Sequence, residues 1–449
     1  MKNSILYILL FFFPIAMLAQ NSVLDNYIKE GLESNLAIKQ RNLSLENAIY
    51  ALKSARRNYI PTLNFEGIYT TAEGGRSYEI PVGDYLNPLL NTVNQFLSTP
   101  IPNLDNEKIN FLPKDYYDAK VRLAVPILNM DIIHNNEIRQ QQAKLSENDV
   151  IIFERELVKE IKITYYNYLS AKKAVEIYQN VIDLAEESKR MNERLMEAGK
   201  SVYAYTLRAE TEIEQAKTKL KNAEYQAHSV QLYFNALLNR ESNENIVIEE
   251  SVQNIPLIDR NEVSVANREE MTSLENLISL RESILKMNKQ TFIPKLSGFA
   301  DAGAQAEKMR FNKEALYYMV GLQLTFPIFN GTKNNLAIKV AKNDIEIAKY
   351  QKQEIEQKLN LSVQVAYNNV LTEQANYEAA LKQLELAETY HRLINKGYDS
   401  GINTYIETVD ARTQLSSAKI ATNVSYYQLL IAQAKLERET ASYSLPNKN

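Results

Sequence analysis

Two carboxylates near the C-terminus are spaced so that together they could attract cations. Glu407 and Asp410 follow a glycine-containing turn at 397–401 and lie three residues apart. In a helix this spacing places both side chains on one face. Carboxylates brought together around an axis concentrate negative potential and attract cations. The alternative is an ordinary solvated helix face, where most Asp and Glu residues of helices lie.

No other group of residues has a spacing that predicts catalysis. The three histidines, His134, His228 and His391, are far apart in the chain, without a second histidine or a carboxylate at metal-ligand spacing. The sequence also has no phosphate-binding glycine loop, no Gly-x-Ser-x-Gly turn and no His-Glu-x-x-His pair. We therefore expect no enzyme activity, no metal and no cofactor.

The composition predicts a few long elements instead of several compact domains. The 449 residues include only 12 Gly and 12 Pro, the residues that end most helices and strands. There is no Cys, which excludes disulfides and thiolate metal sites. The net charge of −4, without basic blocks, gives no electrostatic basis for binding nucleic acid.

The N-terminus resembles a secretory signal peptide. Lys2 precedes an apolar run from Ile5 to Leu18, and the small residue Ala19 follows it, so we expect a signal peptide at 1–19. A transmembrane anchor is the alternative, but the run is short and Pro14 interrupts it.

The remaining chain reads as an internal duplication marked by prolines. Ile60-Pro61-Thr62-Leu63 resembles Ile293-Pro294-Lys295-Leu296, and Pro126-Ile127-Leu128-Asn129 resembles Pro327-Ile328-Phe329-Asn330. Because proline ends helices and is tolerated mainly at strand ends, Pro61, Pro126, Pro294 and Pro327 are expected at strand boundaries. Each half then reads helix, strand, loop, strand, helix. The first repeat spans 20–239 and the second spans 271–442.

Four strands are expected, at about 62–72, 117–126, 295–304 and 317–327. Apolar and polar residues alternate in them; Leu63 and Phe65, for example, fall opposite Asn64 and Glu66. Strands of this length with two unlike faces fit a membrane barrel, but four are too few to close one. Three chains would supply twelve. Edge strands of a soluble sheet are the alternative.

Helices account for most of the remaining residues. The runs 129–197 and 333–396 lack Pro and Gly, and apolar residues recur in them every three or four positions, which predicts long coiled-coil helices. Turns at Gly199 and at Gly397 and Gly401 lead to partner helices at 203–239 and 404–442. Further helices are expected at about 22–58 and 271–291. We expect a mixed insert beside the helices at 240–270, loops at about 73–116 and 305–316, and a tail at 443–449.

This ordered set of features resembles the outer-membrane efflux protein family, the TolC-like ducts. The resemblance covers nearly the whole mature chain and includes Gly397-Tyr398-x-x-Gly401-x-x-Thr404 followed by Val409-Asp410-Ala411. It implies a mainly α fold with a small β part. It further implies a homotrimer, in which four strands per chain form a shared 12-stranded barrel in the outer membrane of a Gram-negative bacterium. This barrel continues into a long α-helical tunnel in the periplasm. It also implies a periplasmic adaptor and an inner-membrane transporter as partners in efflux or type I secretion.

The resemblance gives the candidate residues their roles. It implies that Glu407 and Asp410 form an acidic ring at the periplasmic entrance and that Tyr398 helps to close it. Gly199, Gly397 and Gly401 would mark the helix tips that meet the adaptor, although they are also needed to end the helices. Asn403 and Tyr205 replace the Arg and Asp of several members, so the closing contacts are expected to differ.

Two other functions compete with the duct. A secreted or periplasmic coiled-coil scaffold would explain the signal peptide and the long helices, but not the matched prolines of the two halves. A periplasmic enzyme with helical arms has no motif in its favour. The cargo, whether drug, metal or protein, is left open.

Overall fold

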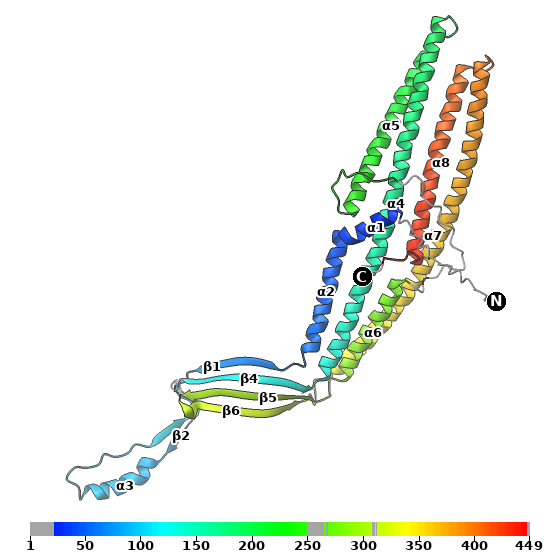
Figure 1. Cartoon of the computed structure of the whole chain (residues 1–449). Coiled ribbons are helices and arrows are strands. Elements are labelled where there is room, and N and C mark those ends of the chain that lie inside the picture. The colour runs from blue at the N-terminus through cyan, green and yellow to red at the C-terminus, as the bar shows by residue number, and fades with distance from the viewer. Residues whose placement is uncertain are drawn as a thin grey trace, which may run out of the picture. The chain divides into compact units, whose positions relative to one another are not determined.

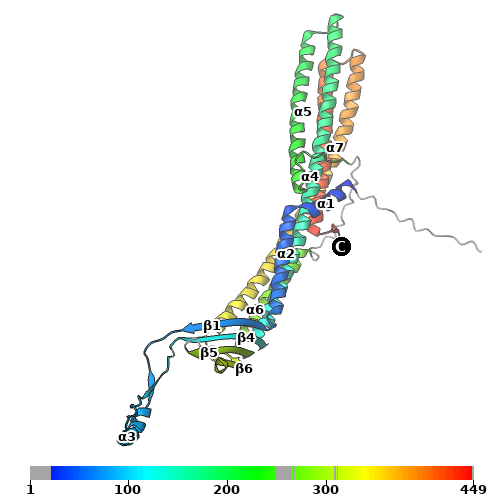
Figure 2. The same cartoon turned by 60° about the vertical axis from the view of Figure 1, so that its left-hand side comes forward.

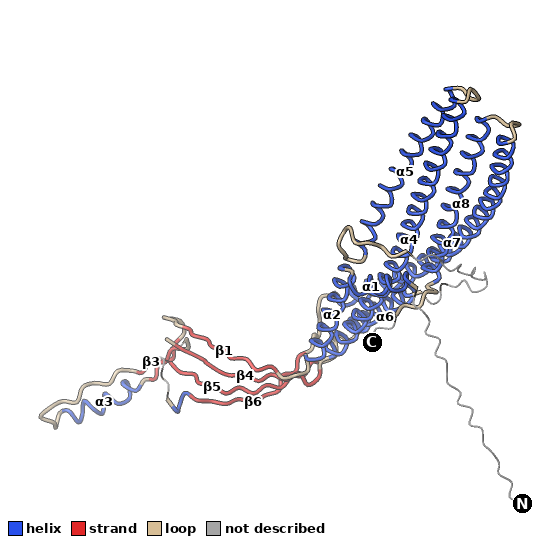
Figure 3. Tube along the Cα trace, turned by 45° about the horizontal axis from the view of Figure 1, so that its top comes forward, coloured by secondary structure: helices blue, strands red, loops and turns tan. Residues whose placement is uncertain are grey.

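The chain is mainly helical, with a small β part, as expected (Figure 3). The structure, a computed structural model, describes residues 22–112, 114–248, 265, 268–307, 310 and 312–446. The expected signal peptide and most of the expected insert at 240–270 lie outside the described residues. The chain divides into a helical unit (1–48, 142–278 and 346–449) and a sheet unit (49–141 and 279–345).

Among the described residues, seven α-helices form the helical unit, and four of them have one end assigned to the sheet unit. They are α1 Val23–Ser34, α2 Leu36–Arg57, α4 Met130–Glu197, α5 Tyr203–Leu237, α6 Glu269–Lys289, α7 Lys333–Asp399 and α8 Tyr405–Thr440. In the helical unit α4 pairs with α5, and α7 pairs with α8, as two antiparallel hairpins (Figure 1). Among the described residues, no helix is both long enough and apolar enough to cross a membrane.

The main core of the helical unit lies where α1 packs against α4, α5 and α8. Tyr27, Tyr165 and Phe234 meet there, with the rings of Tyr27 and Phe234 5.1 Å apart and edge to face. Leu430 from α8 is fully buried in the same cluster. Each such side chain contributes about 1.5–3 kcal/mol when it leaves water, so this cluster fixes both hairpins at their inner ends.

The first expected helix, 22–58, is in fact two helices separated at Asn35. The Asn35 side chain accepts hydrogen bonds from the backbone N–H groups of Ala37 and Ile38, 2.9 and 3.3 Å away, and donates to the carbonyl of Leu237. Asn is a preferred helix-capping residue because its side chain can replace backbone hydrogen bonds. This cap, which depends on a contact with α5, redirects the chain between α1 and α2.

A charged network joins α6 to α8 within the helical unit. Arg268 and Arg438 both donate to the Glu270 carboxylate, each across 2.8 Å, and all three side chains are at least four-fifths buried. Burial alone would raise the pKa of Glu270, because it disfavours the charged form of the side chain. The hydrogen bonds from Arg268 and Arg438 outweigh this effect and lower the pKa to about 2.

Acid should therefore weaken the helical unit. The pKa of Glu270 is lowered from 4.5 in the unfolded chain, so its contribution, on the order of 3 kcal/mol, is complete above pH 4.5 and lost as the pH falls towards 2. We expect Glu270→Gln to lower the melting temperature at pH 7 and to reduce its dependence on pH between 5 and 2. Thermal unfolding in detergent measures both effects. Glu275→Gln, at an exposed carboxylate of α6, is the control, and equal pH profiles would contradict the prediction.

The sheet unit contains a four-stranded antiparallel sheet. Its strands are β1 Thr62–Thr70, β4 Tyr116–Leu128, β5 Lys295–Glu307 and β6 Leu316–Thr325, in the order β1-β4-β5-β6 (Figures 1 and 2). Pairs β1/β4 and β5/β6 are the hairpins of the two repeats, and β4 pairs with β5 to join them. Within the described residues, β1 and β6 are the outer strands of this sheet.

The four prolines do not all lie at strand boundaries. Pro61 and Pro294 directly precede β1 and β5. Pro126 instead lies inside β4, opposite Ser297, and the register shifts between it and Leu128. A bulge tolerates proline because the ladder is interrupted there and needs no N–H donor. Pro327 lies beyond the last residue of β6, Thr325.

The register confirms that the two faces of this sheet differ. One cross-strand row contains Leu63, Leu123, Ala300 and Val320, whereas the adjacent row, on the opposite face, contains Asn64, Arg122, Asp301 and Met319. Val320 is 75% exposed. On the polar face the Arg122 guanidinium holds the Asp301 carboxylate through two hydrogen bonds of 2.7 Å. The sheet thus has an exposed apolar face and a charged face.

The expected loop at 73–116 contains elements that the sequence did not predict. These are β2 Ser77–Ile80, α3 Val82–Asn94 and β3 Glu107–Asn110, with β2 and β3 paired as a small antiparallel sheet. The counterpart in the second repeat is shorter: β5 extends to Glu307, and the 3₁₀ turn η2 Lys313–Ala315 leads into β6.

Candidate functional site

The candidate residues lie at the two helical turns of the helical unit. Gly199 and Gly401 have positive φ angles of 71° and 79°, a conformation that glycine adopts without strain. Backbone hydrogen bonds from Lys200 to Leu195 and from Ile402 to Gly397, both 2.8 Å, close the ends of α4 and α7. Since α7 extends to Asp399 instead of ending at residue 396, Gly397 lies in its last turn and not in the connecting loop.

Gly397 makes a close contact with Asn403 across the second turn. A Cβ atom at this position would lie 1.7 Å from Oδ1 of Asn403. The same Asn403 side chain donates to the Glu407 carboxylate across 3.3 Å. Asn403 therefore connects the end of α7 to the first turn of α8, and a side chain at 397 would displace the Asn403 amide.

Replacing Gly397 by alanine should loosen this turn. The added methyl group displaces the Asn403 side chain and breaks its hydrogen bond to Glu407, an effect of about 1 kcal/mol that is similar in size to the gain of alanine in helix propensity. We therefore expect faster amide exchange at 397–407 without a large change in melting temperature. Asn403→Ala, which removes the same hydrogen bond, should raise the exchange rate to a similar extent. Equal exchange in the wild type and Gly397→Ala would contradict the prediction.

Glu407 and Asp410 differ in their surroundings. Glu407 forms a capping box with Thr404: its carboxylate accepts from the Thr404 N–H across 2.6 Å, and the Thr404 hydroxyl accepts from the Glu407 N–H. The Thr404 N–H first, then the Thr404 hydroxyl and Asn403, hold the pKa of Glu407 below its usual value. Asp410 is exposed and accepts one hydrogen bond from Gln414. The less constrained of the two carboxylates is thus Asp410.

Tyr398 belongs to an aromatic cluster that joins the two turns. Its ring lies 6.3 Å from the ring of Tyr405, and the Tyr405 ring lies 5.1 Å from that of Tyr205 on α5. Tyr405 is almost fully buried and receives a hydrogen bond from the Ser188 hydroxyl of α4. Burial raises the pKa of Tyr398. The aromatic residue Tyr205, which the sequence marked as a departure, therefore contributes ring packing between the hairpins.

Arg412 makes a two-pronged polar contact between the hairpins that the sequence did not predict. Its guanidinium donates two hydrogen bonds, 2.7 and 2.8 Å long, to the carboxylate of Glu212 on α5, and both side chains are about nine-tenths buried. It also donates to the carbonyl of Leu184 on α4. The pair joins residues 200 positions apart, so no local pattern could have shown it.

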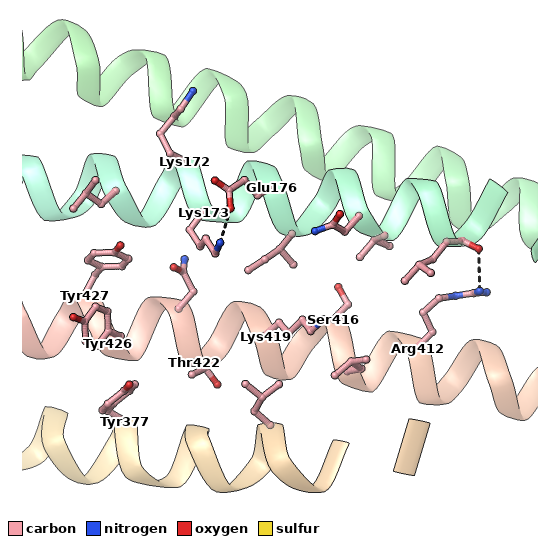
Figure 4. A pocket seen from close by; sticks show the side chains of 18 of the residues that line it. Lys172, Lys173, Glu176, Tyr377, Arg412, Ser416, Lys419, Thr422, Tyr426 and Tyr427 are labelled. Atoms are coloured by element: carbon pink, nitrogen blue, oxygen red, sulfur yellow. Dashed lines mark hydrogen bonds and ion pairs between the residues drawn. The ribbon is translucent and has the colours of Figure 1, made fainter. Parts of the chain in front are cut away.

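A groove of about 770 Å³ runs along the hairpins from Arg412 towards the core (Figure 4). Its walls come from α4, α7 and α8, and its charged residues are mainly cationic, among them Lys172, Lys173 and Lys419. Lys173 is paired with Glu176 across 2.5 Å. Among the described residues, no cluster of His, Asp or Glu could hold a metal ion. The site therefore consists of packed turns, an exposed carboxylate and an open groove.

Comparison with known proteins agrees with this architecture. The profile of the outer membrane efflux protein family matches residues 27–240 and 263–441. The alkaline protease secretion protein AprF of Pseudomonas aeruginosa is 21% identical over 332 residues, which are 72% of this chain and 69% of that one. The solvent efflux pump outer membrane protein SrpC of Pseudomonas putida is 27% identical over 34% of this chain and 33% of its own length. The crystal structure of the outer membrane protein VceC from Vibrio cholerae superimposes with a TM-score of 0.73 at 13% identity, covering 93% of this chain and 95% of that one.

Proposed function

Because the chain belongs to the outer membrane efflux protein family, we propose that three copies assemble into an exit duct that spans the outer membrane of a Gram-negative bacterium. The duct conducts cargo passively from the periplasm to the exterior, as part of a tripartite efflux or type I secretion system. A periplasmic adaptor and an inner-membrane transporter are its partners. The proposal assigns no catalytic step to the chain.

The observation that carries the proposal is the sheet with unlike faces and two outer strands. Its apolar row, including Leu123 and Val320, suits contact with lipid, and its row with Arg122 and Asp301 suits a water-filled interior. Outer strands that stay unpaired would leave backbone groups unsatisfied in lipid. Pairing β1 of one copy with β6 of the next satisfies them, and four strands from each of three copies close a barrel of twelve.

We place the periplasmic entrance at the helical turns. The aromatic cluster around Tyr398 and Tyr405 holds the turns of one copy together, and Asp410 from three copies supplies a ring of negative charge. The turns at Gly199 and Gly401 are the surfaces offered to the adaptor. Gly397 lies in the last turn of α7, in contact with Asn403.

The assembly can be tested by membrane fractionation. The protein should be found in the outer-membrane fraction, should need detergent for extraction, and should have the mass of three chains by light scattering in detergent. A protein that leaves the envelope without detergent as a monomer or dimer would refute the duct and favour the coiled-coil scaffold.

Cation block of the channel tests the entrance. Hexaamminecobalt(III) added to the periplasmic side of a planar bilayer should reduce the current, and Asp410→Asn should weaken this block about tenfold, because removing three charges lowers the attraction by roughly 1.4 kcal/mol. Glu407→Ala should also lower the melting temperature, since it removes the side chain that completes the capping box with Thr404. Glu388→Gln, at an exposed site on α7, is the control. Unchanged block in Asp410→Asn would place the entrance elsewhere.

A further inference from the structure

The segment 77–110, here called the finger, is an ordered unit that the duct does not require. After α3 the chain returns alongside the helix, held by two asparagines of its inner face. Asn87 makes two hydrogen bonds to the backbone of Leu104, 2.8 and 2.9 Å long, and Asn94 makes two of 2.8 Å to the backbone of Ile101. These side chains bind the return segment as a neighbouring strand would.

The base of the finger is fixed in the same way. The side chain of Asn106 accepts from the backbone N–H groups of Gly83 and Asp84 at the start of α3. A Cβ atom at Gly83 would lie 2.2 Å from the Leu104 carbonyl oxygen, so the return segment touches the helix backbone. The return segment is therefore held against one side of α3.

The other side of the finger is an apolar stripe. On α3, Tyr85, Leu89 and Val93 recur every four residues and are 75%, 65% and 47% exposed, and Phe96, two residues beyond the end of the helix, extends the stripe and is 85% exposed. The asparagine face of α3 lies against the return segment, so the stripe is on the side that the finger itself does not cover. A continuous apolar stripe of this length is uncommon on a free surface and indicates a binding partner.

The charges of the finger argue against a lipid surface as this partner. Helices that lie on anionic membranes carry Lys and Arg on their polar face. Between residues 81 and 106 there is no Lys or Arg, and the charged residues are Asp84 and Asp105. Identical neutral stripes, by contrast, can pack against one another around an axis while the acidic residues face water.

The chain connectivity brings such stripes together. The finger joins the end of β1 to the start of β4, the ends opposite those connected to α2 and α4 (Figure 1). In the proposed duct, on which this inference rests, the three fingers therefore emerge from the outer rim of one barrel. We infer that the α3 stripes of the three copies pack together at the threefold axis and form a cap over the outer opening.

Single cysteines provide the test, because the chain contains none. Leu89→Cys places a thiol on the stripe, and Phe96→Cys is a second variant at an even more exposed position. Asn91→Cys, two residues from Leu89 and on the other side of the helix, is the matched control. Each full-length variant is treated on intact cells with a short membrane-impermeant bis-maleimide, and its mass in detergent is measured separately by light scattering. Cross-linking should also reduce channel current.

We expect Leu89→Cys and Phe96→Cys to yield about tenfold more cross-linked dimer than Asn91→Cys, because packing raises the effective thiol concentration. A trimer by light scattering with equally little cross-linking in all three variants would refute the cap and leave the duct intact. If Leu89→Cys cross-links no more than Asn91→Cys and is in addition protected from an aqueous maleimide, the stripe lies in lipid and the inference is wrong. A protein without a trimer would instead refute the duct itself.

Discussion

Val320→Arg should prevent the protein from accumulating as a trimer in the outer membrane. Val320 lies near the middle of β6 in the apolar row and is 75% exposed in the single chain. An arginine on the lipid face of a barrel costs about 2–4 kcal/mol at the bilayer centre, and a trimer would incur this cost three times. The fraction of protein recovered as a detergent-extracted trimer measures the effect.

Gln323→Arg is the matched control. Gln323 lies three residues further along β6, on the opposite face of the sheet, opposite Ser297. In the duct that face lines a water-filled interior, where an added arginine is hydrated, so this variant should assemble normally and change only the ion selectivity. The faces would be assigned wrongly if Gln323→Arg failed to assemble while Val320→Arg formed trimers.

The sequence was sufficient to predict those helices and strands that are determined by the residue types within them. Runs without Gly and Pro predict the long helices α4 and α7 because nothing in them ends a helix. Alternation of residue type predicts the two faces of the four-stranded sheet, since side chains of a strand alternate strictly. The family resemblance, read from the order of these features and the turn motifs, is confirmed by the family profile.

What the sequence could not show depends on contacts between distant residues. The break at Asn35 requires the carbonyl of Leu237, and the finger requires Asn87 and Asn94 to bind a return segment whose position is set by the fold. The family resemblance groups Glu407 with Asp410 in one acidic ring, although Thr404 three residues earlier is the local signal of a capping box. Tertiary hydrogen bonds thus decide which polar residues of the candidate site are available for function.

Arg412→Met should separate the two hairpins near the entrance. The substitution leaves the Glu212 carboxylate buried without its partner, and breaking a buried ion pair in this way costs about 3–5 kcal/mol. Because the pair joins α8 to α5 next to the aromatic cluster, we expect a lower melting temperature of the trimer and a larger current through the duct. Arg208→Met, at an exposed position of α5, should change neither.

A double variant separates the ion pair from the rest of the turn. Arg412→Met combined with Glu212→Leu replaces both charges by apolar side chains, a change that is often nearly neutral because no buried charge is left over. It should therefore restore most of the melting temperature lost in Arg412→Met. The larger current should persist if the charged pair itself holds the entrance closed, and it should return to the wild-type value if packing between α5 and α8 is sufficient. A single variant as stable as the wild type would show that the pair contributes little to joining the hairpins.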